Sequence, residues 1–311
     1  MGYIPFRIIS ALAEQEGFCA VGSCRIEKAE ADFFDEWLDR GFHSSMSYME
    51  NYKEIRKDPS LLLCGAKSLI SFLYSYNDER IDGDFAFKIA HYAQRKDYHY
   101  VIKSKLNNII SKLKEQYPFF EARVFTDSAP ILERYWAEKC GLGRIGKSTL
   151  LINKDYGSKV FLSEIVSDFS TDYSSVSETE KMKSPCGKCR KCIDACPNGA
   201  LSETLGLNAA KCISYQTIEN KENIPAGLKT AEYIYGCDIC TEVCPWNMKA
   251  KRTSVQDPQT KELIKLVLSK IEQNLTVDKS DFNLLKKNSP INRIKYGKFL
   301  SNIYSAGTEN D

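Results

Sequence analysis

The chain has 311 residues, with 43 Lys and Arg against 41 Asp and Glu, so its formal net charge is +2. This balance gives no global field that would attract nucleic acid, and any such binding must come from a local basic patch. No apolar run reaches the length of a membrane span, and the first residues lack the basic-then-apolar layout of a signal peptide. We therefore expect a cytoplasmic protein, with room for roughly two domains.

Helical and strand patterns alternate through the first 167 residues, which predicts an α/β domain over residues 1–170. Helices are expected at 4–16, 27–40 and 85–117, the last one broken near 95–96. Strands are expected at 18–22, 66–76, 121–125, 150–152 and 159–166. Pro130 is expected to open another helix, which runs to Cys140 and is capped by Gly141.

The segment Thr-Asp-Ser-Ala-Pro lies between a predicted strand and a predicted helix, and it contains Asp127 and Ser128. In open α/β sheets, ligands gather at the carboxyl ends of strands, so these side chains could meet a substrate. Asp and Ser are also common N-caps of helices. The residues alone leave both interpretations open.

Residues 141–148 read GLGRIGKS, which satisfies both the phosphate-loop pattern and the dinucleotide-binding pattern. Both motifs need a strand before the loop and a helix after it, so that the helix N-terminus faces the phosphate. Here a helix precedes the loop and a β-like run follows it, so we expect no nucleotide site. The glycines instead allow a sharp turn and a close approach to a ligand, and Lys147 could contact an anionic group of another cofactor.

Eight of the 12 cysteines fit a pair of iron–sulfur clusters. Residues 186–197 read CGKCRKCIDACP, the C-x₂-C-x₂-C-x₃-C-P spacing of bacterial proteins with two [4Fe–4S] clusters. Residues 237–245 read CDICTEVCP, a second run whose missing cysteine Cys212 can supply. In such pairs the fourth cysteine of a run binds the other cluster. That rule assigns Cys186, Cys189, Cys192 and Cys244 to one cluster, and Cys196, Cys212, Cys237 and Cys240 to the other.

A zinc ribbon also uses C-x₂-C pairs, but zinc does not require a cysteine triplet followed twice by Cys-Pro. Disulfides are the other alternative, and a reducing cytoplasm disfavours them. The proline after each fourth cysteine, Pro197 or Pro245, is expected to stop the turn from continuing as a helix. The remaining four cysteines are interpreted as small buried hydrophobic residues: Cys19, Cys24, Cys64 and Cys140.

The ferredoxin-like module is expected over residues 171–250, after a linker at 168–185 that is rich in Ser, Thr, Asp and Glu. Residues 251–311 are expected to form a short, basic helical segment, with an amphipathic helix at 263–275 and a frayed tail.

Several stretches together resemble the epoxyqueuosine reductase family. They are DSAPILERYWAEKCGLGRIGKSTLLINKDYGS, CISYQTIE at 212–219, the double cysteine run, DPSLLLCGAKS, HYAQRKDYHY and SPINRIK. The resemblance covers roughly residues 40–300. It implies an oxidoreductase that reduces epoxyqueuosine to queuosine at the wobble position of tRNA, the last step in making that base. It also implies cobalamin, two [4Fe–4S] clusters and an external low-potential electron donor.

The resemblance makes Asp127 the proton donor to the oxygen that leaves the epoxide ring, with a pKa raised by desolvation beside the corrin. The chain has no D-x-H-x-x-G signature, and the resemblance implies a cobalamin whose own base is displaced with no histidine in its place. Of the three histidines, His99 is interpreted as structural or facing tRNA rather than lying at the cofactor edge. The residues expected to contact cobalamin are Asp127, Ser128, Ala129, Gly146, Lys147, Ser148, Ile152, Asn153, Ser214, Gln216 and Thr217.

Two basic strips are candidates for binding tRNA phosphates, with simple solvation as the alternative interpretation. One consists of Arg293, Lys295 and Lys298, and the other of Lys188, Arg190 and Lys191. Stacking of a splayed-out base on an aromatic ring is expected from Tyr48, Tyr98 or Trp246.

Many family members carry a C-terminal helical-repeat extension that this chain is too short to hold, and we expect a monomer. Two competing functions remain, a reductive dehalogenase and a ferredoxin-type electron carrier. A missing export signal disfavours the first, and the α/β half, which a carrier does not need, disfavours the second.

Overall fold

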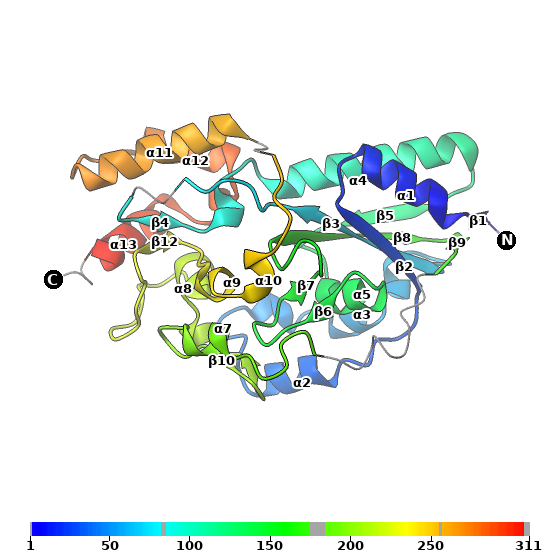
Figure 1. Ribbon diagram of the computed structural model, residues 1–311, viewed down its shortest axis with the longest axis horizontal. Coiled ribbons are helices and arrows are strands. Elements are labelled where there is room, and N and C mark those ends of the chain that lie inside the picture. The colour runs from blue at the N-terminus through cyan, green and yellow to red at the C-terminus, as the bar shows by residue number, and fades with distance from the viewer. Residues whose placement is uncertain (1, 82–84, 174–183, 255–256, 308–311) are drawn as a thin grey trace.

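The computed structural model describes residues 2–81, 85–173, 184–254 and 257–307. Its centre is a four-stranded sheet in the order β2-β3-β8-β5 (Figure 1). All three strand pairs are antiparallel. The predicted mixed α/β class is confirmed, but the rule that ligands gather at the carboxyl ends of strands belongs to parallel sheets and does not explain this site. The four strands are β2 (Ala20–Arg25), β3 (Ser68–Ser75), β8 (Val160–Ser167) and β5 (Ala122–Phe125).

Helices cover both faces of this sheet, because successive side chains of a strand point to opposite faces. Ile70 and Phe72 of β3 pack with α1 and α4 on one face. Leu69 and Leu73 pack with α2 and α5 on the other face. Figure 1 shows α1 and α4 above the sheet and α2, α3 and α5 below it. These helices are α1 (Phe6–Gln15), α2 (Asp32–Asp39), α3 (Lys53–Lys57), α4 (Tyr98–Gln116) and α5 (Glu133–Lys139).

Most of the elements predicted for the first half are present. The helix predicted at 4–16 is α1, and Gly17 follows it with φ +82°, as a C-terminal cap requires. The strands predicted at 66–76, 121–125 and 159–166 are β3, β5 and β8. The predicted helix start at Pro130 is wrong, because α5 begins three residues later, at Glu133.

The helix predicted from residue 85 is wrong over its first third. Only α4 is helical as expected, and Asp97 begins it by accepting a hydrogen bond from the His99 amide. The preceding residues form β4 (Lys88–Ile89) and a 3₁₀ turn at His91–Ala93. β4 pairs in parallel with β12 (Tyr233–Tyr235), far away in the chain, and local periodicity carries no sign of that partner.

The cysteine runs lie in a region of short helices and strands below and beside the sheet (Figure 1). The helix before Pro245, α9, ends at Glu242, and Cys244 is extended, so the expectation that the turn does not continue as a helix through Pro245 is confirmed. Pro245 then occupies the first position of a new helix, where its missing N–H costs nothing. The elements are α7 (Lys191–Asp194), β10 (Leu201–Ser202), β11 (Gly206–Leu207), α8 (Ile213–Ile218), α9 (Ile239–Glu242) and α10 (Pro245–Met248).

The C-terminal helices share one hydrophobic core with residues from the N-terminal half. Ile264 and Phe299 of these helices are fully buried with Ile89 of β4 and Ile234 of β12. The described part of the C-terminal segment therefore packs against residues from earlier in the chain. The helices are α11 (Pro258–Glu272), α12 (Lys279–Asn288) and α13 (Tyr296–Gly307).

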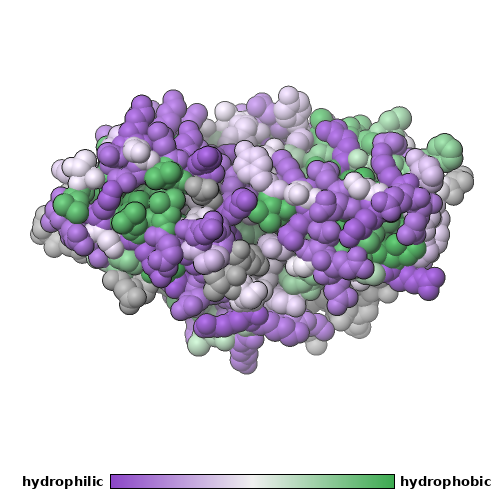
Figure 2. Space-filling model, turned by 90° about the horizontal axis from the view of Figure 1, so that it is seen from above, coloured by the Kyte–Doolittle hydropathy of each residue, from purple (hydrophilic) through white to green (hydrophobic). Residues whose placement is uncertain are grey.

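Figure 2 shows the face that carries α4 at one end and α11 and α12 at the other, and this face is mainly hydrophilic. No helix of the described residues is both long enough and apolar enough to cross a lipid bilayer. In the predicted linker, residues 170–171 form β9 (Ser170–Thr171), which pairs with β1 (Tyr3–Ile4), while residues 174–183 lie outside the described residues. The end of the predicted tail, residues 308–311, also lies outside them.

Candidate active site and iron–sulfur module

The seven cysteines of the two runs, and Cys212 between them, carry free thiols. Burial, and then the neighbouring thiols of Cys186 and Cys244, raise the pKa of Cys192. Burial also raises the pKa of Cys237, and there the neighbouring thiols are Cys212 and Cys196. These neighbours agree with the crossing rule for paired clusters, but Cys192 also lies near Cys240 of the other group, and the assignment of each ligand stays a prediction.

Backbone amides point at two of these sulfurs, as is common around iron–sulfur clusters. The Lys147 amide donates to Cys186 Sγ at 3.3 Å, and the Ala200 amide donates to Cys196 Sγ at 3.3 Å. The free thiols, their grouping and these donors fit two [4Fe–4S] clusters.

The glycine-rich segment forms a hairpin beside the first group of cysteines. β6 (Arg144–Ile145) and β7 (Leu151–Ile152) pair in antiparallel fashion around it, so a strand follows the loop, as predicted, and the phosphate-loop geometry is absent here. A Cβ added to Gly146 would lie 2.5 Å from Ile152 Cδ1 and 3.2 Å from Cys186 Sγ. The glycine therefore lets the chain pass close to a cysteine of the cluster module.

Asp127 lies at the end of β5 with a left-handed backbone, φ +56°. It does not cap α5, which is preceded by Leu132, so the N-cap interpretation is wrong. Its carboxylate meets His99 instead, with Oδ2 2.9 Å from Nε2. The other ring nitrogen of His99, Nδ1, lies 2.7 Å from Asp97 Oδ1. Asp97, His99 and Asp127 thus form a continuous hydrogen-bonded chain.

The carboxylates control the charge of His99. Burial lowers its pKa, but the hydrogen bonds to Asp127 and Asp97 outweigh burial and raise the pKa of His99 to about 9. Burial favours the neutral form of Asp127, but the hydrogen bond and charge of His99 outweigh it and hold the pKa of Asp127 below its ordinary value. The raised pKa expected for Asp127 is therefore wrong, because the sequence did not reveal the histidine beside it. At neutral pH the proton of this pair resides on His99.

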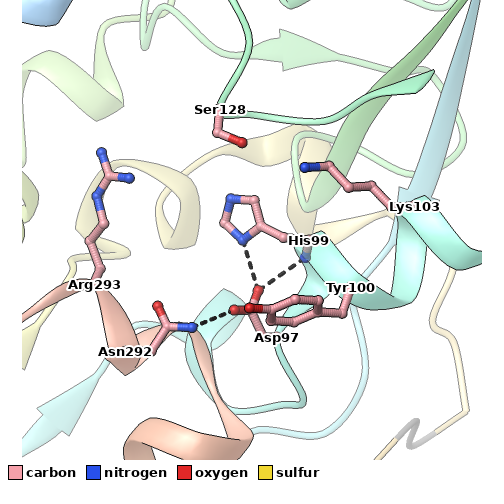
Figure 3. Close-up of a pocket in the computed structure, with 7 residues that line it drawn as sticks. All are labelled: Asp97, His99, Tyr100, Lys103, Ser128, Asn292 and Arg293. Atoms are coloured by element: carbon pink, nitrogen blue, oxygen red, sulfur yellow. Dashed lines mark hydrogen bonds and ion pairs between the residues drawn. The ribbon is translucent and has the colours of Figure 1, made fainter. Parts of the chain in front are cut away.

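A polar pocket of about 250 Å³ lies on one side of this chain (Figure 3). Asn292 Nδ2 donates to Asp97 Oδ2 at 2.6 Å, which ties the C-terminal region to the site. Figure 3 shows Arg293 and Lys103 flanking the opening, with Ser128 facing His99 across it. The lining residues are Asp97, His99, Tyr100, Lys103, Ser128, Asn292 and Arg293.

A second cavity, of about 180 Å³, is lined by Asp127 itself. One wall is largely apolar, and Phe161 on it stacks on Tyr98 with ring centroids 4.1 Å apart. Glu133 lies beside Asp127, and its Oε1 accepts the Asp127 amide at 2.5 Å. The cavity is lined by Tyr98, Asp127, Glu133, Arg134, Leu150, Leu151, Ser158, Val160, Phe161 and Leu162.

Among the residues expected to contact cobalamin, Asp127 and Ser128 line these cavities, one each. Three others have side chains engaged within the protein. Asn153 Nδ2 donates to the Leu142 carbonyl at 2.7 Å, Gln216 Nε2 donates to the Ala210 carbonyl at 2.5 Å, and Thr217 Oγ1 accepts the Gly236 amide at 2.9 Å.

The others are placed as follows. Lys147 forms an ion pair with Glu203. Gly146, Ser148 and Ile152 are buried, whereas Ala129 and Ser214 are partly buried. Their contact with a cofactor stays a prediction.

The residues proposed to grip tRNA are dispersed. Arg293 lies 5.9 Å over the Tyr48 ring and 3.0 Å from Glu219. Lys298 donates to a carbonyl at 2.7 Å, and Arg190 pairs with Glu203 at 2.7 Å. Lys188, Lys191 and Lys295 are exposed.

Two of the aromatic candidates for base stacking have partners inside the protein. Tyr98 stacks on Phe161 and on His99, and Trp246 Nε1 donates to the Pro185 carbonyl at 3.0 Å. Tyr48 is 41% exposed, although Arg293 lies over its ring, and its role in base stacking stays a prediction.

The four other cysteines behave differently from one another. Cys140 is buried and its Sγ lies 3.3 Å from Cys24 Sγ, and Cys19 is partly buried. Cys64 is exposed, so the expectation that it is a buried hydrophobic residue is wrong.

Sequence reasoning missed Glu133, Arg134 and Asp97 as members of the site. Glu133 follows Asp127 by six residues in the stretch DSAPILERYW. Two carboxylates so close in the chain are a signal that could have identified Glu133 as a member of the site. Asp97 was hidden because it belongs to a stretch that was predicted to lie inside a helix.

Comparisons with known proteins give a consistent family. The family model described as "Epoxyqueuosine reductase QueG, DUF1730" matches residues 56–128, and the "4Fe-4S double cluster binding domain" matches residues 185–247. An epoxyqueuosine reductase of Cyclobacterium marinum is 38% identical over 311 residues, covering 97% of each chain. One of Leadbetterella byssophila is 37% identical over 288 residues, covering 92% of each chain.

A solved structure gives the same result. The epoxyqueuosine reductase of Streptococcus thermophilus superposes with a TM-score of 0.78 at 26% identity, covering 97% of this chain and 80% of that one. With full-length relatives above 30% identity and a shared fold, the chain belongs to the epoxyqueuosine reductase family.

Proposed function

We propose that this protein reduces epoxyqueuosine to queuosine in tRNA, with electrons passing through two [4Fe–4S] clusters to cobalamin. The observation that carries the proposal is the position of Asp127. It lines the cavity with an apolar wall, and its hydrogen-bond partner His99 lines the polar cavity, which has basic side chains at its opening. A nucleic-acid substrate suits the polar cavity, and a large redox ring suits the cavity with the apolar wall.

The relatives support this substrate. The curated relatives of 33–38% identity carry the name epoxyqueuosine reductase, which favours this activity over a reductive dehalogenase or a simple electron carrier. A solved epoxyqueuosine reductase of the same fold was crystallised with an epoxyqueuosine-modified tRNA stem loop. Another, from Bacillus subtilis, is described with its catalytic aspartate loop swung out of the active site.

The residues of the second cavity fit cobalamin by their chemistry. Leu150, Val160 and Leu162 offer an apolar wall for the face of a corrin, and Ser158 and Arg134 add polar groups for its edge. When bound, cobalamin supplies a metal centre that takes single electrons from the clusters and reduces the substrate. Positioning the epoxide and delivering protons are left to the side chains of this chain.

Asp127 is proposed as the group that protonates the departing oxygen. His99 Nε2 carries a proton at neutral pH and lies 2.9 Å from Asp127 Oδ2, within direct transfer distance. Asp97 fixes the ring by accepting from Nδ1, and Asn292 fixes Asp97 in turn. Asp127 therefore passes on a proton that His99 stores.

The test is an anaerobic assay of cluster-loaded protein with cobalamin, a chemical reductant and tRNA that contains epoxyqueuosine. Mass spectrometry of the nucleosides should show queuosine with the parent, and a loss of about 100-fold or more with Asp127→Asn. Parent protein that makes no queuosine would refute the function. Near-parental turnover by Asp127→Asn would refute the acid role alone.

The cluster ligands are tested separately. Replacing Cys212 by serine should remove one cluster and lower the iron content by roughly half, because each cubane needs its four thiolates. Cys64→Ser is the matched control, since Cys64 is exposed and belongs to neither run. Equal iron content in the two variants would contradict the assignment.

A further inference from the structure

Glu133 is the second carboxyl of the site, and its backbone contact with Asp127 fixes the geometry between them. It is the first residue of α5, and its Oε1 accepts the Asp127 amide at 2.5 Å. This bond holds the turn at Asp127 in its left-handed conformation. Both carboxyls line the same cavity.

The surroundings of Glu133 favour its protonated form. Burial has the largest effect, and the charge of Asp127 the next largest, and together they raise the pKa of Glu133 to about 8. The groups that face Glu133 are Asp127 on the loop after β5, Tyr98 and His99 on α4, Arg134 on its own helix, Arg56 on α3 and Glu164 on β8. The nearby cations do not reverse the shift.

The reaction itself requires two protons. Converting an epoxide to an alkene breaks two C–O bonds and forms one C=C bond, and the oxygen leaves as water. The balance is one epoxide, two electrons and two protons giving one alkene and one water. The proposed electron donor supplies the electrons, and His99 with Asp127 supplies one proton.

We propose that Glu133 supplies the second proton, by reprotonating Asp127, which it contacts directly on the wall of the cavity that both residues line. Asp127 gives its first proton to the ring oxygen as the ring opens, and it gives the second to the same oxygen as this leaves as water. Bulk water then reprotonates Glu133 and His99. The proposal rests on the proposed function, because it assigns a role within that reaction.

Glu164 does not compete for this role. It is fully buried on β8 opposite Ser71 of β3, and it is absent from the lining of the cavity. Burial raises its pKa well above the ordinary value, so it stays a neutral neighbour of Glu133. It therefore adds no negative charge that would need to be discharged during turnover.

A purely structural role for Glu133 is the competing explanation, and one substitution separates the two. Glutamine keeps an oxygen that can accept the Asp127 amide, but it has no acidic proton to give. Glu133→Gln should therefore preserve the turn and abolish the proton supply. Glu133→Ala removes both. Glu138→Gln, on the same helix and paired with Arg144 at 2.9 Å, is the matched control.

The kinetic test compares these variants with the parent between pH 6 and 9. Turnover of the parent should fall as the pH rises through about 8, where Glu133 loses its proton. Glu133→Gln should reduce kcat by about 100-fold with little change in KM. It should lose the fall near pH 8 and keep only the later fall near pH 9, where His99 loses its proton. If Glu133→Gln keeps the parental kcat and pH profile while Glu133→Ala fails, the role is structural and the proposal is wrong.

A second readout needs no turnover. Infrared pH-difference spectra of the cluster-loaded protein without tRNA should show a protonated carboxyl band that disappears with a midpoint near pH 8. The band should be missing in Glu133→Gln and should titrate at lower pH in Asp127→Asn, where the neighbouring negative charge is gone. A parent without such a band overturns the inference, whatever the activity assay shows. A parent that makes no queuosine but shows the band overturns only the proposed function.

Discussion

Asp78 is the centre of a buried charge cluster, and neutralising it should destabilise the protein strongly. Its Oδ1 lies 2.9 Å from His91 Nε2 and 2.8 Å from Arg95 Nη2, and its Oδ2 lies 3.1 Å from Lys261 Nζ. All four side chains are at most 6% exposed. In Asp78→Asn the amide nitrogen would replace one carboxylate oxygen. If that nitrogen faces Lys261, two hydrogen-bond donors face each other and neither has an acceptor.

The free energy of unfolding should fall because the charges of Arg95 and Lys261 would stay buried without the carboxylate that neutralises them. Removing one partner of a buried ion pair costs about 3–5 kcal/mol, whereas an exposed pair contributes about 0–1 kcal/mol. Because Lys261 is on α11 and His91 follows β4, the loss should loosen the attachment of the C-terminal helices. Urea unfolding of the anaerobic, cluster-loaded protein, followed by tryptophan fluorescence, measures the difference.

Glu262→Gln is the control for this measurement. Glu262 lies on the same helix, next to Lys261, but its ion pair with Lys265 is exposed, at 71% and 44% of the two side chains. Its free energy of unfolding should stay within about 1 kcal/mol of the parent. If Asp78→Asn also stays within that margin, the buried cluster does not stabilise the fold as argued.

Three further predictions concern stability. Trp136→Ala should cost about 3–5 kcal/mol in urea unfolding, because Trp136 is 1% exposed in the core between α5 and the sheet; a smaller loss would mean that the site collapses around the cavity. Gly143→Ala should lower Tm, since its Cβ would lie 2.4 Å from the Ile152 carbonyl oxygen, whereas Gly297→Ala meets nothing within 4 Å and should leave Tm nearly unchanged. Burial lowers the pKa of His91 from 6.5 to about 4, so between these pH values the unfolded chain binds a proton at His91 that the folded chain does not bind. The free energy of unfolding should therefore fall by about 3 kcal/mol as pH drops across that window, and His91→Phe should lose this dependence.

The cluster module could be predicted from the sequence because its information is local. The spacing of Cys186, Cys189 and Cys192 within one short run is set by the geometry of a cubane, and no distant contact is needed to recognise it. The same holds for α1 and α4, whose apolar positions repeat at helical intervals.

The proton chain could not be predicted, because it joins positions that only the fold brings together. His99 and Asp127 are separated by 28 residues, and Asn292 and Asp97 by 195. The pKa of Asp127 was consequently predicted in the wrong direction. The expected cofactor suggested that the carboxyl is buried, but nothing in the sequence indicated the charged imidazole beside it. In the same way, residues 88–89 were predicted to be helical but form the strand β4, because they pair with the distant strand β12.

The core that Ile81, Ile89 and Ala93 share with the C-terminal helices has a consequence for synthesis. Ile81, Ile89 and Ala93 leave the ribosome long before Ile264, Leu285 and Phe299, which later cover them. Until then an apolar surface stays open to solvent and to other nascent chains, and contacts of such large sequence separation form slowly. A ribosome that stalls near residue 250 should therefore present a chain that chaperones hold, although both cysteine runs have already been made.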